Sequence, residues 1–301
     1  MLSRKDKLLL LKVLSLFSVV RGYNLLMIVI AQYLASIYIL SPDLPLRQVV
    51  FDVNLFIIVI ASSLVIAGGY IINNFYDAEK DLINKPRKSM LDRLVSQRFK
   101  LSAYFILNFL AVFAASYVSF KAVLFFSAYI FGIWLYSHKL KKIPFLGNFV
   151  SATLAITPFF AVFVYYKNFE SVIFVHAMFL FLLILVREVI KDLENISGDV
   201  AQNYRTVPII YGVGVSKILI VILLLFTLIP SLLLTFKFDV GYMNYYFAGC
   251  IGLFIVFTII LAKSSTRKHF VWLHNILKLI IVVGVFSILL IDVDLVLNRI
   301  L

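Results

Sequence analysis

The chain has 301 residues, of which 63% are hydrophobic and only 14% are charged. A water-soluble protein of this size carries about 25% charged residues, so the composition excludes an ordinary soluble fold and favours one that lipid covers. The net charge of +13 would point to nucleic acid in a soluble protein. In a membrane protein it marks cytoplasmic loops instead, and we expect no nucleic-acid partner.

Nine apolar segments approach the roughly 20 residues that a helix needs to cross a bilayer. The basic start of the chain is followed by no small-residue cleavage site, so the first segment is interpreted as a retained helix rather than a signal peptide. We therefore expect an all-α membrane protein, a bundle of about nine transmembrane helices in a single domain over residues 1–301. The predicted helices lie near residues 15–40, 49–75, 101–119, 121–136, 146–166, 170–191, 213–236, 243–262 and 271–296.

Basic residues alternate between the two sides of the predicted bundle. Of the 28 Lys and Arg residues, 21 lie in the N-terminal tail and in every second loop, and only five lie on the opposite side. Basic loops stay in the cytoplasm, so this asymmetry predicts a cytoplasmic N-terminus. With an odd number of helices the C-terminus is then external. The expected location is the cell inner (cytoplasmic) membrane, with several passes through it.

The first of two long polar segments, residues 73–100, follows the second predicted helix. Its residues Asn73, Asp77 and Asp81 are spaced by four, which places them on one face of a helix. Two carboxylates and an amide oxygen on one stripe suit Mg²⁺, which prefers hard oxygen ligands and is commonly shared with substrate phosphate.

The second polar segment, residues 187–212, follows the sixth predicted helix and repeats this arrangement. Glu188, Asp192, Asn195 and Asp199 fall at i, i+4, i+7 and i+11, again one helical stripe, although Gly198 is expected to loosen the turn before Asp199. The two segments align at an offset of 118 residues as a weak internal repeat. Acidic residues are disfavoured at helix C-termini, so two such clusters indicate compensating cations. The fold prediction therefore includes two pseudo-repeated Asp-rich cytoplasmic segments.

The first segment resembles the Asn-Asp-x-x-Asp-x-x-x-Asp signature of the UbiA family of intramembrane prenyltransferases, and the second resembles that family's second Asp-rich motif. Asn74 and Asn195 depart from it, because each stands where an acidic residue is usual. The combination of motifs is most similar to the geranylgeranylglycerol-phosphate geranylgeranyltransferase group. Other matching elements are Arg21 with Asn24, Asn84-Lys85-Pro86, Tyr136-Ser137-His138-Lys139-Leu140-Lys141, Gly147-Asn148 and Arg205-Thr206-Val207-Pro208.

The resemblance implies Mg²⁺-dependent transfer of a prenyl group from a polyprenyl diphosphate, with geranylgeranyl as the first candidate, to a lipophilic acceptor. A glycerol-phosphate ether lipid is the favoured acceptor, and an aromatic quinone precursor or a porphyrin-type ring is the alternative. It implies one Mg²⁺ on Asn73, Asp77 and Asp81 and a second on Glu188, Asp192 and Asp199. Asp77, Asp81, Asp192 and Tyr136 are the expected catalytic residues, with the Tyr136 ring facing the allylic cation. The expected diphosphate contacts are Arg21, Asn24, Arg87, Lys139, Lys141 and Arg205.

A secondary transporter is the rival from another functional class. Transporters place substrate sites near the bilayer midplane at broken helices, whereas the ionisable clusters here lie at the ends of predicted helices. Lys278, one turn from His274 in the last predicted helix, is an exception, since an intramembrane charge often marks a functional site. Snorkelling to the cytoplasmic side is the favoured explanation for Lys278. No obligate protein partner is expected.

Overall fold

The structure, a computed structural model, describes residues 4–293, with side chains from residue 11 onward. This part of the chain is helical and contains no strand. It has nine helical spans that are long and apolar enough to cross a membrane, which confirms the predicted number. The spans are α2 with the π-helical turn after it (Gly22–Leu40), α4 (Val53–Tyr76), α7 (Gln97–Val118), α8 (Phe120–His138), α9 (Leu146–Tyr166), α10 (Ser171–Ala201), α11 (Val207–Phe236), α12 with the 3₁₀ turn before it (Gly241–Lys263) and α13 with the 3₁₀ turn after it (Arg267–Leu290).

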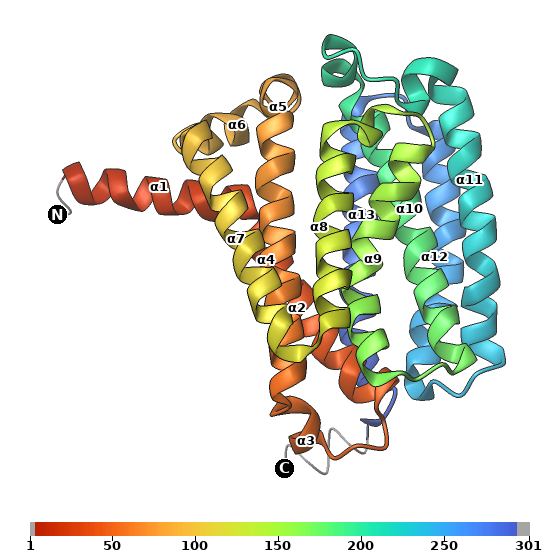
Figure 1. Cartoon of the computed structure of the whole chain (residues 1–301). Coiled ribbons are helices and arrows are strands. Elements are labelled where there is room, and N and C mark those ends of the chain that lie inside the picture. Colours follow the sequence, from red (N-terminus) through yellow and green to blue (C-terminus); the bar gives the residue numbers. More distant parts are fainter. Residues whose placement is uncertain (1–3, 294–301) are drawn as a thin grey trace.

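The first predicted helix, 15–40, is divided into two. Helix α1 (Arg4–Val20) ends at Arg21, whose φ of 51° is left-handed, and α2 (Gly22–Ala35) begins at the next residue. Figure 1 shows α1 projecting sideways from the bundle near the end that carries α5 and α6. A Cβ atom at Gly22 would lie only 2.0 Å from the Phe17 ring, so a larger residue here would require the exposed Phe17 side chain to move.

The two long polar segments are mostly helical, as the spacing of their acidic residues predicts. Helix α10 continues beyond residue 191 to Ala201, and only residues 202–206 separate it from α11. Gly198 does not interrupt α10, which continues for three residues beyond it to Ala201. The segment after α4 forms the short helices α5 (Ala78–Asn84) and α6 (Pro86–Asp92), and the remaining short helix, α3 (Leu46–Val50), lies at the opposite end of the bundle (Figure 1).

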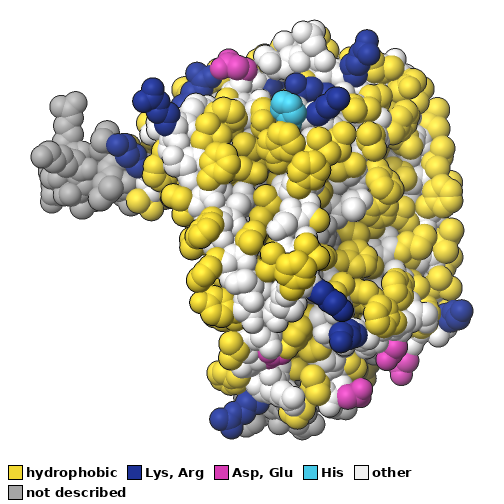
Figure 2. All heavy atoms as spheres, in the orientation of Figure 1, with side chains coloured by type: hydrophobic (Ala, Val, Ile, Leu, Met, Phe, Trp, Pro, Cys, Tyr) yellow, Lys and Arg dark blue, Asp and Glu magenta, His cyan; other side chains and the backbone are white. Residues whose placement is uncertain are grey.

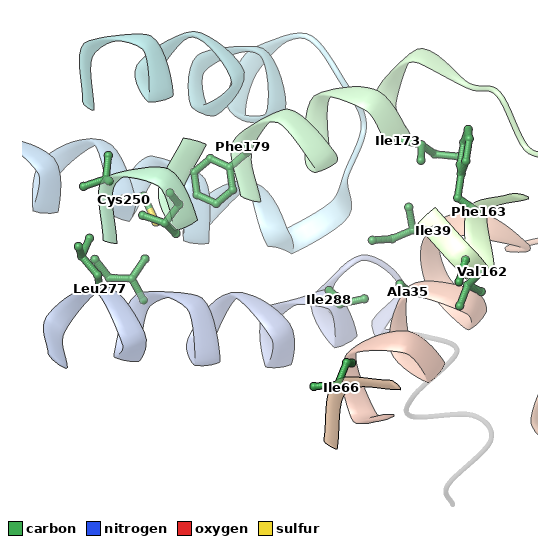
Figure 3. Close-up of a cluster of buried hydrophobic side chains, with 14 of the residues drawn as sticks. Ala35, Ile39, Ile66, Val162, Phe163, Ile173, Phe179, Cys250, Leu277 and Ile288 are labelled. Atoms are coloured by element: carbon green, nitrogen blue, oxygen red, sulfur yellow. The ribbon is translucent and has the colours of Figure 1, made fainter. Parts of the chain in front are cut away.

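The outside of the bundle is apolar where lipid would cover it. Figure 2 shows hydrophobic side chains over the middle of the displayed face and most charged side chains towards its two ends. Large residues such as Phe109, Phe131 and Ile255 are exposed on spanning helices. Inside, a continuous cluster of buried apolar side chains joins α2, α4, α9, α10, α12 and α13, with Cys250 and Leu277 facing each other across it (Figure 3). The chain is therefore a multi-pass membrane protein.

Polar side chains inside the bundle satisfy the backbone around a proline in α9. Pro158 has no N–H to offer the carbonyl of Leu154 four residues earlier, and the hydroxyl of Tyr129 in α8 donates to that carbonyl at 3.0 Å. The carbonyl of Pro158 accepts from Gln32 Nε2 of α2 at 2.9 Å. Since lipid provides no hydrogen bonds, these contacts fix α9 against α8 and α2.

Candidate active site at the polar end of the bundle

The two Asp-rich segments lie at the same end of the molecule. Figure 1 shows α5 and the α10–α11 connection at this end, which we call the polar end. The backbone N–H of Asp77 donates to the Asn73 carbonyl at 2.9 Å, and that of Asp81 donates to the Asp77 carbonyl at 2.8 Å. The helical turn therefore continues from α4 into α5, and Asn73, Asp77 and Asp81 lie on successive turns, as their spacing predicts.

Asp77 is the centre of a buried network. Its Oδ1 accepts from Lys141 Nζ at 2.6 Å and from the hydroxyl of Tyr204 at 3.0 Å. Asn73 Oδ1 accepts from the same ammonium group at 3.2 Å, so the two oxygens, one turn apart on α4, converge on one cationic centre. Burial opposes ionisation of Asp77, but the charges of Lys141 and Lys80 outweigh it and hold the pKa of this carboxyl below its usual range.

The second segment joins this network through Asp199. Asp199 is fully buried, forms an ion pair with Lys80 of α5, and accepts from the Thr206 hydroxyl at 3.3 Å. The Lys80 ammonium lies 4.5 Å from the centre of the Tyr204 ring, and Tyr204 is the donor to Asp77. Lys80 and Tyr204 therefore link the two Asp-rich segments directly.

Glu188 and Asp192, the other carboxylates of the α10 stripe, contact polar side chains of α9 and of α10 itself. Asn148 Nδ2 donates to Asp192 at 2.7 Å, and Ser151 Oγ donates to Glu188 at 2.9 Å. Glu188 also forms ion pairs with Arg187 at 2.8 Å and Lys191 at 2.6 Å. Tyr136 lies within electrostatic range of Glu188, Lys191 and Asp192. Tyr136, Glu188 and Asp192 thus come together, beside the Asp77–Asp199 network.

The donor set fits a divalent ion that brings phosphate ligands with it. Within the described residues, no three His, Cys, Asp or Glu side chains form a metal-binding group, and Glu188, Asp192 and Asp199 are not gathered at one point. Mg²⁺ is commonly bound through only one or two carboxylates plus substrate phosphates and water. The oxygens of Asn73 and Asp77 already converge on a cation, the Lys141 ammonium, and so offer that kind of half-complete site.

The remaining predicted site residues are spread around this centre. The side chains of Arg87, Lys139 and Arg205 are exposed and make no hydrogen bond or ion pair with the described part of the chain, and Asp81 is half-buried with no such side-chain partner. Arg21 and Asn24 meet on Tyr70 of α4: the guanidinium lies 4.9 Å from the ring centre, and Asn24 Nδ2 donates to the hydroxyl at 3.1 Å.

Several residues of the site were not predicted from the sequence. Lys80 and Tyr204 had a signal, because Lys80 lies between Asp77 and Asp81 and Tyr204 directly precedes the matching Arg205-Thr206-Val207-Pro208 element. Arg267 had none. It donates to the backbone carbonyls of Asn84 at 2.5 Å and Glu194 at 3.1 Å, and only the tertiary fold brings the start of α13 to those two positions.

Asn74, one of the departures from the family signature, points away from the Asp77 network. Its Nδ2 donates to Asp92 at 3.0 Å, and its Oδ1 accepts from Lys100 at 2.8 Å. Asn74→Asp would set two carboxylates against each other in a buried position. We expect it to reduce the free energy of unfolding by about 1–3 kcal/mol, seen as a lower melting temperature, with the Mg²⁺ requirement unchanged.

Asn54→Asp is the matched control for Asn74→Asp, because Asn54 is exposed in the first turn of the same helix, where a negative charge is favourable. It should leave the melting temperature unchanged or slightly raised. A tighter Mg²⁺ requirement in Asn74→Asp, without loss of stability, would contradict the structural role of Asn74.

Comparison with known proteins agrees with this geometry. The sequence profile of the UbiA prenyltransferase family matches residues 13–289. A digeranylgeranylglyceryl phosphate synthase from Thermococcus sibiricus is 34% identical over 225 residues, 74% of this chain and 79% of that protein. Another protein with that name, from Saccharolobus solfataricus, is 28% identical over 234 residues, 75% of this chain and 80% of that protein.

Solved structures share the fold. A digeranylgeranylglyceryl phosphate synthase structure superposes with a TM-score of 0.70 at 22% identity, covering 92% of this chain and 97% of that one. A UbiA homologue from Archaeoglobus fulgidus bound to GPP and Mg²⁺ superposes with a TM-score of 0.67 at 14% identity, covering 91% and 99%. The match of the family profile over nearly the whole chain confirms the resemblance seen in the motifs: this chain belongs to the UbiA prenyltransferase family.

Proposed function

We propose that this protein transfers a prenyl group, with geranylgeranyl as the first candidate, from its diphosphate to a glycerol-phosphate ether lipid in a Mg²⁺-dependent reaction. One observation carries the proposal: the oxygens of Asn73 and Asp77 converge on a single cationic position inside a buried network. The curated relatives named as digeranylgeranylglyceryl phosphate synthases support the choice of acceptor, and the neighbour bound to GPP and Mg²⁺ supports the donor and the metal.

The donor diphosphate is assigned to the space beside Asn73, Asp77 and Lys141. When bound, Mg²⁺ neutralises charge on the leaving diphosphate. Asn73 and Asp77 would hold one ion with Asp81. A second ion on Glu188, Asp192 and Asp199 stays a prediction, because these three carboxylates are not gathered at one point. Lys141 is already placed to contact a phosphate oxygen at the same point. Arg21, Asn24, Arg87, Lys139 and Arg205 remain predicted diphosphate contacts.

The remaining steps depend on excluding water and on orientation. Loss of diphosphate leaves an allylic cation that water would capture, so the reaction needs a site closed to bulk solvent. The described bundle supplies apolar walls from α4, α9 and α10 beside the network. Tyr136, close to Glu188 and Asp192, is assigned to face the cation with its ring, and the acceptor then attacks the freed carbon.

The decisive experiment supplies purified protein in lipid nanodiscs with labelled geranylgeranyl diphosphate and a panel of acceptors. We expect a Mg²⁺-dependent product with geranylgeranylglyceryl phosphate, abolished by EDTA and restored by added Mg²⁺. A product formed only with a phosphate-free aromatic acceptor would replace the proposed acceptor by the quinone-precursor alternative. Transport of donor or acceptor across liposomes with no covalent product would favour the transporter reading.

We place the protein in the inner membrane of the cell, with the polar end and its site on the cytoplasmic side. The sequence has one cysteine, the buried Cys250, so replacing it with Ala gives a background without thiols. Ser265→Cys, exposed between α12 and α13 at the polar end, should react with a membrane-impermeant maleimide only after cells are permeabilised. Asp43→Cys, exposed at the other end between α2 and α4, should react in intact cells. The reverse pattern would overturn the orientation.

A further inference from the structure

A buried carboxylate–imidazole pair lies between α10 and α13, apart from the acidic stripe of α10. Glu194 Oε2 and His274 Nδ1 are 2.6 Å apart, and both residues are about 6% exposed. A carboxylate only accepts hydrogen bonds, so in a neutral ring Nδ1 carries the proton and Nε2 presents a lone pair. His274 Nε2 has no hydrogen-bond partner among the described residues. It is not among their polar atoms that are both unpartnered and shielded from solvent, whereas Nε2 of His176 is.

Several positive side chains lie near the pair, and two of them, Lys278 and Lys85, lack direct partners. Lys278, one turn after His274, interacts electrostatically with Arg187, Glu194 and Arg21, and Lys85 interacts with Glu194 and Arg21. Within the described chain neither lysine forms an ion pair or a side-chain hydrogen bond. Arg187 Nε is buried without an acceptor. Uncompensated charge in a membrane bundle is costly, so this cluster offers donors to an anion that is not part of the chain.

The cluster borders the donor site. Lys85 interacts electrostatically with both Glu194 and Asp81. Arg267 binds the backbone carbonyls of both Asn84 and Glu194, so the end of α5 is fixed directly against the part of α10 that carries Glu194. A ligand held by Lys85 and Lys278 would therefore lie beside the segment that continues the Asn73–Asp77–Asp81 stripe.

We propose that this cluster binds the headgroup of the acceptor, with Lys278, Lys85 and Arg187 on its phosphate and His274 as the base that removes its hydroxyl proton. The proposal rests on the proposed function, in which the acceptor carries both a phosphate and a hydroxyl group. Two positive side chains and a buried guanidinium donor match a phosphate. An acceptor without an anionic group would leave Lys278 and Lys85 without a direct partner.

The step balances in atoms and charge. The acceptor oxygen forms a bond to the allylic carbon of the donor, and the bond from that carbon to the diphosphate oxygen breaks with its electron pair on the diphosphate. The hydroxyl proton moves to His274 Nε2. The imidazolium that forms is stabilised by the Glu194 carboxylate, which also orients the ring, as carboxylates do for catalytic histidines. A base inside the site is needed because bulk water is kept out.

The test uses the full protein in nanodiscs with geranylgeranyl diphosphate and geranylgeranylglyceryl phosphate. His274→Gln should lower kcat for transfer on the order of 100-fold, with both KM values little changed and slow hydrolysis of the donor to prenyl alcohol retained. Lys278→Met should raise the KM for the phosphate acceptor roughly tenfold or more, with the KM for the donor unchanged. His269→Gln and Lys268→Met, both exposed in the first turn of the same helix, are the matched controls and should behave as the parent protein.

Glu194→Gln is the second test variant, to be used if His274→Gln fails to fold. Its amide oxygen can still accept a hydrogen bond from His274 Nδ1. As a positioning change it should lower transfer relative to donor hydrolysis, a ratio that a simple loss of stability would not move. A parent protein that prenylates only phosphate-free acceptors would refute the proposed function itself. With phosphate-acceptor activity present, full transfer by the His274 and Glu194 variants, or a raised donor KM in Lys278→Met, would overturn this inference alone.

Discussion

Asp77→Asn is expected to reduce prenyl transfer at least about 100-fold while the bundle stays folded. Asp77 is a buried carboxylate that accepts hydrogen bonds from Lys141 and Tyr204. The same Lys141 ammonium group also donates to Asn73. The amide has the same shape and can still accept from Tyr204, so packing is preserved. It lacks the negative charge that a cation bound to diphosphate requires. The measurement is the rate of product formation at saturating donor and acceptor, with the Mg²⁺ concentration varied.

Glu79→Gln is the matched control for Asp77→Asn, because Glu79 lies two residues away and is 70% exposed in a surface ion pair with Arg93. Surface pairs of this kind contribute little to stability, so the control should retain full activity and the parent melting temperature. Near-normal turnover in a folded Asp77→Asn protein would remove Asp77 from the active site and with it the assigned position of the metal.

Gly198→Ala is expected to destabilise the contact between α5 and α10 by about 1–3 kcal/mol and to lower activity. Asn84 is held against Gly198 by two hydrogen bonds, from the Gly198 N–H to Asn84 Oδ1 at 3.1 Å and from Asn84 Nδ2 to the Asn195 carbonyl at 3.3 Å. A Cβ atom at residue 198 would lie 2.4 Å from Asn84 Nδ2. Because backbone atoms hold this amide on both sides, α5 must shift, and Lys80 would move away from Asp199.

Gly252→Ala provides the comparison for Gly198→Ala. Gly252 also lies within a spanning helix, α12, but no atom lies within 4 Å of the position its Cβ would take. Alanine favours helix over glycine by about 1 kcal/mol, so this variant should be as stable as the parent protein or more stable. Equal melting temperatures for Gly198→Ala and the parent would mean that α5 is not held as tightly as the Asn84 contacts indicate.

The number of spanning helices and the two Asp-rich stripes could be predicted because both depend on periodicity within one segment. Asn73 and Asp77 share one face of their helix regardless of how the helix packs. The length of an apolar segment alone identifies a membrane span. The end of α10 was placed ten residues early because its last turns, near Asp192 and Asp199, are polar. These turns stay helical because they are buried against α5 and α9. The sequence of α10 alone does not reveal those two partners.

The contacts that assemble the Asp77–Asp199 network join residues more than 60 positions apart and could not be predicted. Lys141 reaches Asp77, Lys80 reaches Asp199, and Arg267 joins two other helices. The sequence shows which of these residues are charged but not which charges meet. Lys278 is the clearest case: snorkelling explained it from the sequence, whereas the structure places it among Arg187, Glu194 and Arg21.

Pro158 has a consequence for how the protein enters the membrane. A newly made α9 alone in lipid would carry the free carbonyl of Leu154, which costs free energy in a hydrocarbon environment. The hydroxyl that satisfies it belongs to Tyr129 in α8, the span synthesised just before. Helices α8 and α9 should therefore leave the insertion machinery together as a hairpin, and Tyr129→Phe should delay the integration of α9 even where the finished protein tolerates the change.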